Sequence, residues 1–149
     1  MLELYQHDLS DIWDQDLDPH GEFGYELDRF WSRPDCWPYV FLVDAKFAGF
    51  ALVDTRVRVE GDEFWMDQFF VMKKYRRQGV GQAGAVFVLA QHPGRWQVGQ
   101  MPQNRSARSF WRQVIDEFTG GQFVEEEVGS GWWKGFVQRF SSLGRTIDA

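Results

Sequence analysis

The segment Val71–Gly81 constrains the fold of this chain more than any other part of its sequence. Apolar residues run up to Val71 and a pattern compatible with a helix begins at Val80, so the segment predicts a strand, a basic turn and a helix that opens on glycine. Backbone N–H groups at such a turn point outward together, and the helix dipole adds partial positive charge at the same place. Gly79 and Gly81 lack the Cβ atoms that would hold an anion away from those amides. Four basic side chains surround the turn, from Lys73, Lys74, Arg76 and Arg77. The segment is suited to bind a pyrophosphate.

Two common phosphate-binding motifs do not account for this turn. A Walker loop requires Gly-x-x-x-x-Gly-Lys-Ser/Thr, and the chain contains no Lys-Ser or Lys-Thr pair. Gly79, Gly81 and Gly84 do have the spacing of a dinucleotide-binding loop. That loop, however, opens the first βαβ unit of its fold and is followed by an acidic residue about 20 positions later. Here the turn lies in mid-chain, and residues 101–104 read Met-Pro-Gln-Asn. A glycine-rich turn with basic surface side chains remains the simplest alternative.

The hydrophobic pattern predicts one α/β domain over residues 1–149, with no repeat and no linker. The length is that of a single typical domain, which can bury a substantial core. The expected elements are a short helix from Ser10, a helix over Tyr25–Trp31, a hairpin of Tyr39–Asp44 and Phe47–Val53, a strand over Glu63–Val71, a helix after Gly81, a strand over Trp96–Met101, a helix after Asn104, and a closing hairpin of Gln122–Val128 and Trp132–Phe140.

The turn Arg76–Gly81 resembles the Arg-x-x-Gly-x-Gly motif with which the GNAT N-acetyltransferase superfamily holds the pyrophosphate of coenzyme A. A second segment, Asn104–Trp111, resembles the family's Asn-x-x-Ala-x-x-Leu/Phe-Tyr segment, which opens the helix beside the pantetheine arm. The expected order of elements is also that of the family over nearly the whole chain. The resemblance implies a central mixed, mostly antiparallel sheet with a splayed pair of strands and about four flanking helices. It also implies transfer of an acetyl group from acetyl-CoA to a primary amine.

The resemblance further assigns residues to the cosubstrate. Val71 would end the strand that aligns the pantetheine arm, and the turn would hold the pyrophosphate mainly through main-chain amides. Asn104 has an ordinary local role as well, since Asn is a preferred helix N-cap. The residues implied to bind coenzyme A are Phe70, Val71, Arg76, Arg77, Gln78, Gly79, Val80, Gly81, Gln82 and Asn104.

One departure from the family pattern bears on catalysis. Trp111 stands where the family often has the Tyr that protonates the departing thiolate. An indole N–H donates a hydrogen bond but is not a practical proton source. Because thiol pKa values lie near 8.5, water or another tyrosine could serve. The departure keeps open a second class of function, a non-catalytic module with the same fold that binds coenzyme A or a protein partner.

The general base must take a proton from the attacking ammonium group. Histone-acetylating relatives carry a Glu on the central strand, and counting back from Arg76 puts that position at Trp65. Glu63 and Asp67 flank Trp65 at two-residue spacing, so strand alternation places all three on one face unless a bulge intervenes. The apolar surroundings of Asp67 would raise its pKa towards a useful range. Asp67 and Glu63 are therefore the candidate bases, with a surface carboxylate as the alternative for each.

Charge and composition limit the partners. Residues 1–30 hold nine acidic residues and one basic residue. They would repel nucleic acid and attract a cationic amine acceptor, either a small molecule or a peptide, unless they are simply a solvated helix face. The three histidines are unclustered, so no metal site is expected. A single cysteine, Cys36, excludes an intrachain disulfide. No apolar run is long enough for a membrane span and no signal peptide is evident, so a soluble, cytoplasmic protein is expected. The oligomeric state stays open, with a homodimer as one candidate.

Overall fold

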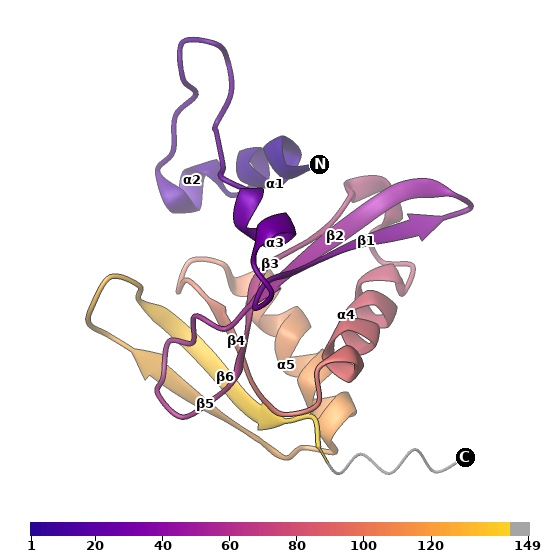
Figure 1. Ribbon diagram of the computed structural model, residues 1–149, viewed down its shortest axis with the longest axis vertical. Helices are drawn as coiled ribbons and strands as arrows, with labels where there is room; N and C mark the ends of the chain where they lie inside the picture. Colours follow the sequence, from indigo (N-terminus) through magenta and orange to yellow (C-terminus); the bar gives the residue numbers. More distant parts are fainter. Residues whose placement is uncertain (144–149) are drawn as a thin grey trace.

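A six-stranded sheet runs through the computed structural model, which describes residues 1–143 (Figure 1). The strands lie in the order β1-β2-β3-β4-β6-β5. The elements are α1 (Leu2–Asp8), α2 (Ser10–Trp13), α3 (Asp28–Ser32), β1 (Trp37–Val43), β2 (Lys46–Asp54), β3 (Phe64–Val71), a 3-10 turn (Lys73–Tyr75), α4 (Val80–Gln91), β4 (Arg95–Gln100), α5 (Arg105–Thr119), β5 (Phe123–Val128) and β6 (Gly135–Ser141).

The sheet splays open between β3 and β4. These two strands are parallel, and they pair only at Phe64 with Trp96 and at Trp65 with Gln97. Every other neighbouring pair of strands in the sheet is antiparallel and paired over six or seven positions. The expected fold class is confirmed: a mixed, mostly antiparallel sheet with one splayed pair.

Helices cover the sheet on two sides, and the alternation of β2 shows why. Ala51 and Val53 are fully buried in a large cluster that contains residues of α4 and α5. Phe50 and Leu52 point the other way, into a smaller cluster with Phe30 of α3 and residues of α1. Successive strand residues face opposite sides of a sheet, so one apolar strand supplies both layers.

A β-bulge interrupts β3 at Asp67. Leu52 pairs with Gln68, but the next residue of β2, Val53, pairs with Met66, which leaves Asp67 as the extra residue. The bulge turns Asp67 and its neighbour Gln68 towards the same side of the sheet, where both line one cavity. Strict alternation would have separated these two side chains.

The elements differ from expectation mainly at the N-terminus and in the last hairpin. Three short helices replace the two expected before β1, and Ser10 donates its hydroxyl to the carbonyl of His7 instead of capping a helix. Strand β6 begins at Gly135, so Trp132 and Trp133 lie in the preceding loop and not in the predicted strand. The large indoles leave the sheet because they pack beside Trp65 and Arg58 instead.

Candidate active site

The turn at Arg76–Gly81, called the glycine turn below, presents free amides at the start of α4. Gly79 is the N-cap with φ of 80°, and Arg77 has φ of 62°, so two residues of the turn adopt the left-handed conformation. No side chain caps this helix, although the first N–H groups of a helix have no partners within it. By contrast, Asn104 caps α5 by accepting a hydrogen bond from the N–H of Ala107 at 3.4 Å. The uncapped start of α4 has the donors that an anion requires.

Glycine is favoured at Gly79, Gly81 and Gly84 for different physical reasons. A Cβ on Gly79 would meet nothing within 4 Å, so its positive φ is what favours glycine there. A Cβ on Gly81 would lie 3.2 Å from the ring of Phe110, and one on Gly84 would lie 2.7 Å from the ring of Phe41. Close packing of α4, and not only access for an anion, therefore favours glycine at these two positions.

The other residues assigned to coenzyme A lie around the same turn. Val71 ends β3, as expected, and its carbonyl accepts a hydrogen bond from Nε of Arg76 at 2.7 Å. The same guanidinium forms an ion pair with Asp8 of α1. The side chain of Phe70 is buried in the smaller cluster. Asn104 reaches the cavity wall described next.

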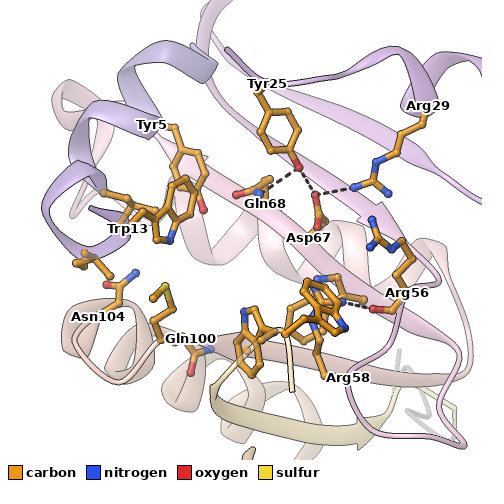
Figure 2. A pocket seen from close by; sticks show the side chains of 17 residues that line it. Tyr5, Trp13, Tyr25, Arg29, Arg56, Arg58, Asp67, Gln68, Gln100 and Asn104 are labelled. Carbon is orange, nitrogen blue, oxygen red and sulfur yellow. Dashed lines mark hydrogen bonds and ion pairs between the residues drawn. The ribbon is translucent and has the colours of Figure 1, made fainter. Parts of the chain in front are cut away.

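A cavity of about 330 Å³ lies beside β3 on the side of α1 to α3, and Figure 2 shows its wall. We call it the Asp67 cavity. Its lining residues come from the N-terminal helices, the segment after β2, β3, the end of β4 and the loop before β6. They are Tyr5, Leu9, Ile12, Trp13, Tyr25, Arg29, Arg56, Arg58, Trp65, Asp67, Gln68, Gly99, Gln100, Met101, Asn104, Trp132 and Trp133.

Asp67 is the only carboxylate among these residues, and a hydrogen-bonded network holds it in place (Figure 2). The hydroxyl of Tyr25 donates to Oδ2 of Asp67 at 2.6 Å, and Nη2 of Arg29 lies 3.2 Å from the same oxygen. Arg29 also pairs with Asp54, which is 1% exposed, through Nη1 at 2.7 Å. Both bonds to Asp67 end on Oδ2, and no residue of the described chain donates a hydrogen bond to Oδ1.

The network sets the protonation of its members. Burial raises the pKa of Asp67, while the Tyr25 hydrogen bond and the charge of Arg29 act in the opposite direction. Burial and the nearby Asp67 charge raise the pKa of Tyr25 to about 12, so Tyr25 keeps its proton and donates it. A partly desolvated carboxylate with one free oxygen can accept a proton from a neighbouring amine.

Arg58 also lines the cavity. Its guanidinium carbon lies 4.1 Å from the ring centroids of both Trp65 and Trp132, so an indole covers the cation on two sides. Burial lowers the pKa of Arg58 to about 10. Arg56 lies next to it, with its guanidinium 5.4 Å from the Trp132 ring.

Two sets of acidic residues that were expected near the site, Glu63 and the acids of positions 1–30, lie outside the cavity. Trp65 and Asp67 line the cavity, but Glu63 precedes β3 and its carboxylate accepts the N–H of Arg95 at 2.8 Å. The acidic residues of positions 1–30 also do not line the cavity, where Asp67 lies among three arginines. The wall charge therefore differs from the acidic rim on which a cationic acceptor was expected.

Sequence reasoning missed Tyr25, Arg58, Trp132 and Trp133 as cavity residues. Tyr25 was assigned to a helix, and the two tryptophans to a strand, where their side chains would have been counted as core. The unusually high aromatic content was the only signal, and it does not distinguish a core from a pocket.

Within residues 1–143, no group of three or more His, Cys, Asp or Glu side chains could hold a metal ion. No helix in the same range is long and apolar enough to cross a membrane.

Known proteins share this arrangement. An aminoglycoside 6′-N-acetyltransferase complexed with coenzyme A superposes with a TM-score of 0.58 at 10% identity, covering 95% of this chain and 90% of that one. A CoA-dependent acyl-homoserine lactone synthase, BjaI, bound to SAM and isopentyl-CoA, gives 0.58 at 11% identity and covers 97% of this chain and 74% of that one. No curated protein sequence is significantly similar to the chain.

These similarities establish the fold, and a family model goes further. The model described as the Acetyltransferase (GNAT) family matches residues 1–114, from α1 through most of α5. The match includes the splayed strands, the glycine turn and Asp67, and it supports acyl transfer from a coenzyme A thioester as the class of reaction. The chain belongs to the GNAT acetyltransferase family.

Proposed function

We propose that this protein transfers an acetyl group from acetyl-CoA to the primary amine of a small acceptor, with Asp67 as the general base. The observation that carries the proposal is the position of Asp67. Its carboxylate is 10% exposed, is held by Tyr25 and Arg29 through one oxygen, and faces a cavity at the splayed strands. The comparison with a CoA-bound aminoglycoside acetyltransferase supports an amine acceptor.

The glycine turn fits the pyrophosphate of the cosubstrate. Its left-handed residues Arg77 and Gly79 and the uncapped amides of α4 supply main-chain donors, and Gln78, Val80 and Gln82 belong to the same segment. The pantetheine arm would follow the end of β3 at Phe70 and Val71 into the gap beside β4, with Asn104 on the far side. Bound acetyl-CoA supplies a thioester carbonyl carbon that an amine can attack.

Asp67 would act on the amine, which is a cation at neutral pH and must lose a proton before it attacks. Oδ1 accepts that proton, a C–N bond forms to the acetyl carbon, and the C–S bond breaks. The nitrogen loses a second proton as the amide forms, the thiolate takes up one proton through solvent, and Asp67 returns its own proton to solvent, so one net proton is released. The raised pKa of Asp67 brings this carboxylate closer to the pKa of the amine, which favours the proton transfer.

Asp67→Asn tests the assignment, and Glu63→Gln is the matched control. A screen of amines with thiol release as the readout identifies an acceptor. With that acceptor, Asp67→Asn should lower kcat by about 100-fold or more near neutral pH, and by less at high pH where the amine is already deprotonated. Glu63→Gln should keep the rate because Glu63 lies outside the cavity. Acetyl-CoA affinity should be unchanged in both variants.

Other outcomes would have definite meanings. A rate indifferent to Asp67→Asn would remove Asp67 as the base. Normal binding of acetyl-CoA without transfer to any amine would favour the alternative, a module that keeps the fold and the cosubstrate but not the chemistry.

A further inference from the structure

We infer that the acceptor carries an anionic group, a carboxylate or a phosphate, which binds at Arg58 while its amine faces Asp67. The inference rests on the proposed function, because it specifies which amine the same cavity takes. It assigns a binding role to Arg58, Trp65 and Gln68.

The charges on the cavity wall do not balance. Three guanidinium groups, those of Arg29, Arg56 and Arg58, meet two carboxylates, and both carboxylates, Asp54 and Asp67, pair with Arg29. Arg56 and Arg58 form no ion pair with any carboxylate of residues 1–143. Arg56 is exposed and can be solvated, but Arg58 is partly buried. Buried or partly buried charges in proteins are usually paired, because an unpaired charge loses hydration without compensation. A ligand that brings a negative charge would complete this wall.

The setting of Arg58 leaves one way for such a ligand to bind. The ring centroids of Trp65 and Trp132 each lie 4.1 Å from the guanidinium carbon of Arg58, and a guanidinium that contacts aromatic rings can still bind a partner through its N–H groups. One Nη1–H already donates to the carbonyl of Arg56. The remaining edge has the fork geometry that matches two oxygens of a carboxylate or phosphate.

Two buried donors at this end of the cavity have no hydrogen-bond partner: Nε of Arg58 and Nε1 of Trp65. Such unsatisfied groups are rare in native proteins and require an explanation. The Arg58 guanidinium carbon lies 4.1 Å from the Trp65 ring centroid, so the two unsatisfied donors belong to side chains in contact. Their shared neighbourhood points to a single anion site.

Another residue of the cavity wall, Gln68, has an unsatisfied acceptor instead of an unsatisfied donor. Oε1 of Gln68 is a buried acceptor without a partner. The orientation of this amide is determined by its neighbour: Tyr25 gives its only proton to Asp67 and can therefore only accept from Gln68, through Nε2 at 3.3 Å. Oε1 is thus left without a donor from residues 1–143, and Oδ1 of Asp67 on the same cavity wall is also free. An ammonium group would satisfy Oδ1 of Asp67.

An anion site at Arg58 and a cation site at Asp67 in one cavity fit a small zwitterionic amine. At about 330 Å³ the cavity is at the small end of ligand pockets, which span about 300–1,000 Å³. Tyr5, Trp13 and Trp133 line the space as well and would contact an apolar body. An amino acid or an amine that bears a phosphate fits this distribution of charge, whereas a polyamine would bring a second cation to Arg58.

Matched pairs of acceptors test the inference. L-phenylalanine and L-phenylalaninamide share the amine and the ring but differ in the carboxylate. O-phosphoethanolamine and ethanolamine form the phosphate pair, and spermidine represents a cationic acceptor. In at least one pair kcat/KM for the anionic member should exceed that of its partner by about tenfold or more. The pair that shows the larger ratio identifies carboxylate or phosphate as the anion.

Arg58→Met then shows whether this preference comes from Arg58. The ratio within the preferred pair should fall to about twofold or less, since the anion loses its bidentate partner. Arg33→Met is the matched control, because Arg33 is exposed, pairs with Asp35 and lies outside the cavity. It should retain the wild-type ratio. Calorimetric titration of each anionic member in the presence of coenzyme A measures binding without turnover and should show the same loss in Arg58→Met.

Each result decides between the possibilities. A preference for spermidine or for the pair members that lack the anionic group would overturn the inference, as would a preference that survives Arg58→Met. If no amine is acetylated but an anionic amine binds in an Arg58-dependent manner, the anion site stands and the proposed activity fails. If zwitterions neither bind nor react, the inference is wrong.

Discussion

The glycine turn and the Asp67 cavity both adjoin β3, but different chemical groups form them. In the turn, one continuous segment from Arg76 to Gly81 supplies main-chain N–H groups at the start of α4. In the cavity, side chains from five parts of the chain meet. The turn should therefore tolerate changes of side chain that do not add charge or bulk near its amides. The cavity should respond to the loss of single hydroxyl, carboxylate or guanidinium groups.

The largest effect is expected in the turn, from Gly79→Glu. The new carboxylate would lie at the start of α4, where it competes with and repels the pyrophosphate, so the affinity for coenzyme A should fall about 100-fold or more. Gly79→Ala is the control. Its Cβ meets nothing within 4 Å, and its positive φ costs roughly 1–2 kcal/mol of stability without adding charge. Calorimetry with coenzyme A compares the two, and normal binding by a folded Gly79→Glu protein would disprove the pyrophosphate assignment.

A smaller effect, which depends on pH, is expected in the cavity from Tyr25→Phe. The Tyr25 hydrogen bond favours the ionised form of Asp67 and so opposes the effect of burial. Without it the pKa of Asp67 rises further. The rate requires the ionised carboxylate and is lost as the pH falls through this pKa, so the acid limb of kcat/KM should move to higher pH. At neutral pH the rate should drop several-fold and should recover on the alkaline side.

Tyr39→Phe is the matched control for this change. The Tyr39 hydroxyl bonds with Nε2 of His92 at 2.6 Å, outside the cavity, so its loss should leave the pH profile in place. An acid limb that does not move in Tyr25→Phe would mean that Asp67 is not the group whose ionisation limits the rate.

The contrast between a local turn and a cavity built from distant segments also decides how much of each the sequence could predict. The glycine turn is local, so its strand, its loop and its helix could be predicted from neighbouring residues, and β3 does end at Val71. The expected hairpin turn is also local: Asp44 and Ala45 both have positive φ between β1 and β2. The roles of these residues towards coenzyme A remain predictions.

The cavity could be predicted only in part. Alternation from Trp65 correctly placed Asp67 beside it, but the bulge that also brings in Gln68 depends on the pairing of β3 with β2. Arg58 lies in a segment without regular structure, and it meets Trp132 across more than seventy residues of sequence. No spacing rule reports such a contact, because it arises from the packing of the whole domain.

The smallest effect on catalysis is expected from Trp111→Phe, in the layer of α4 and α5 on the other side of the sheet. Trp111 is 4% exposed and packs edge-on against Phe69 at 4.9 Å. Removing half of the indole leaves a space, so unfolding should become easier by about 1–3 kcal/mol, while kcat changes less than about threefold. Trp31→Phe, at a position 68% exposed, should leave stability unchanged.

Trp111→Tyr places a hydroxyl where relatives carry their acid and should raise the rate if thiolate protonation limits it. Denaturant titration and thiol release measure the two quantities separately. A large loss of turnover in a folded Trp111→Phe protein that still binds acetyl-CoA would show that the indole takes part in the reaction, and that the catalytic groups extend beyond the cavity at Asp67.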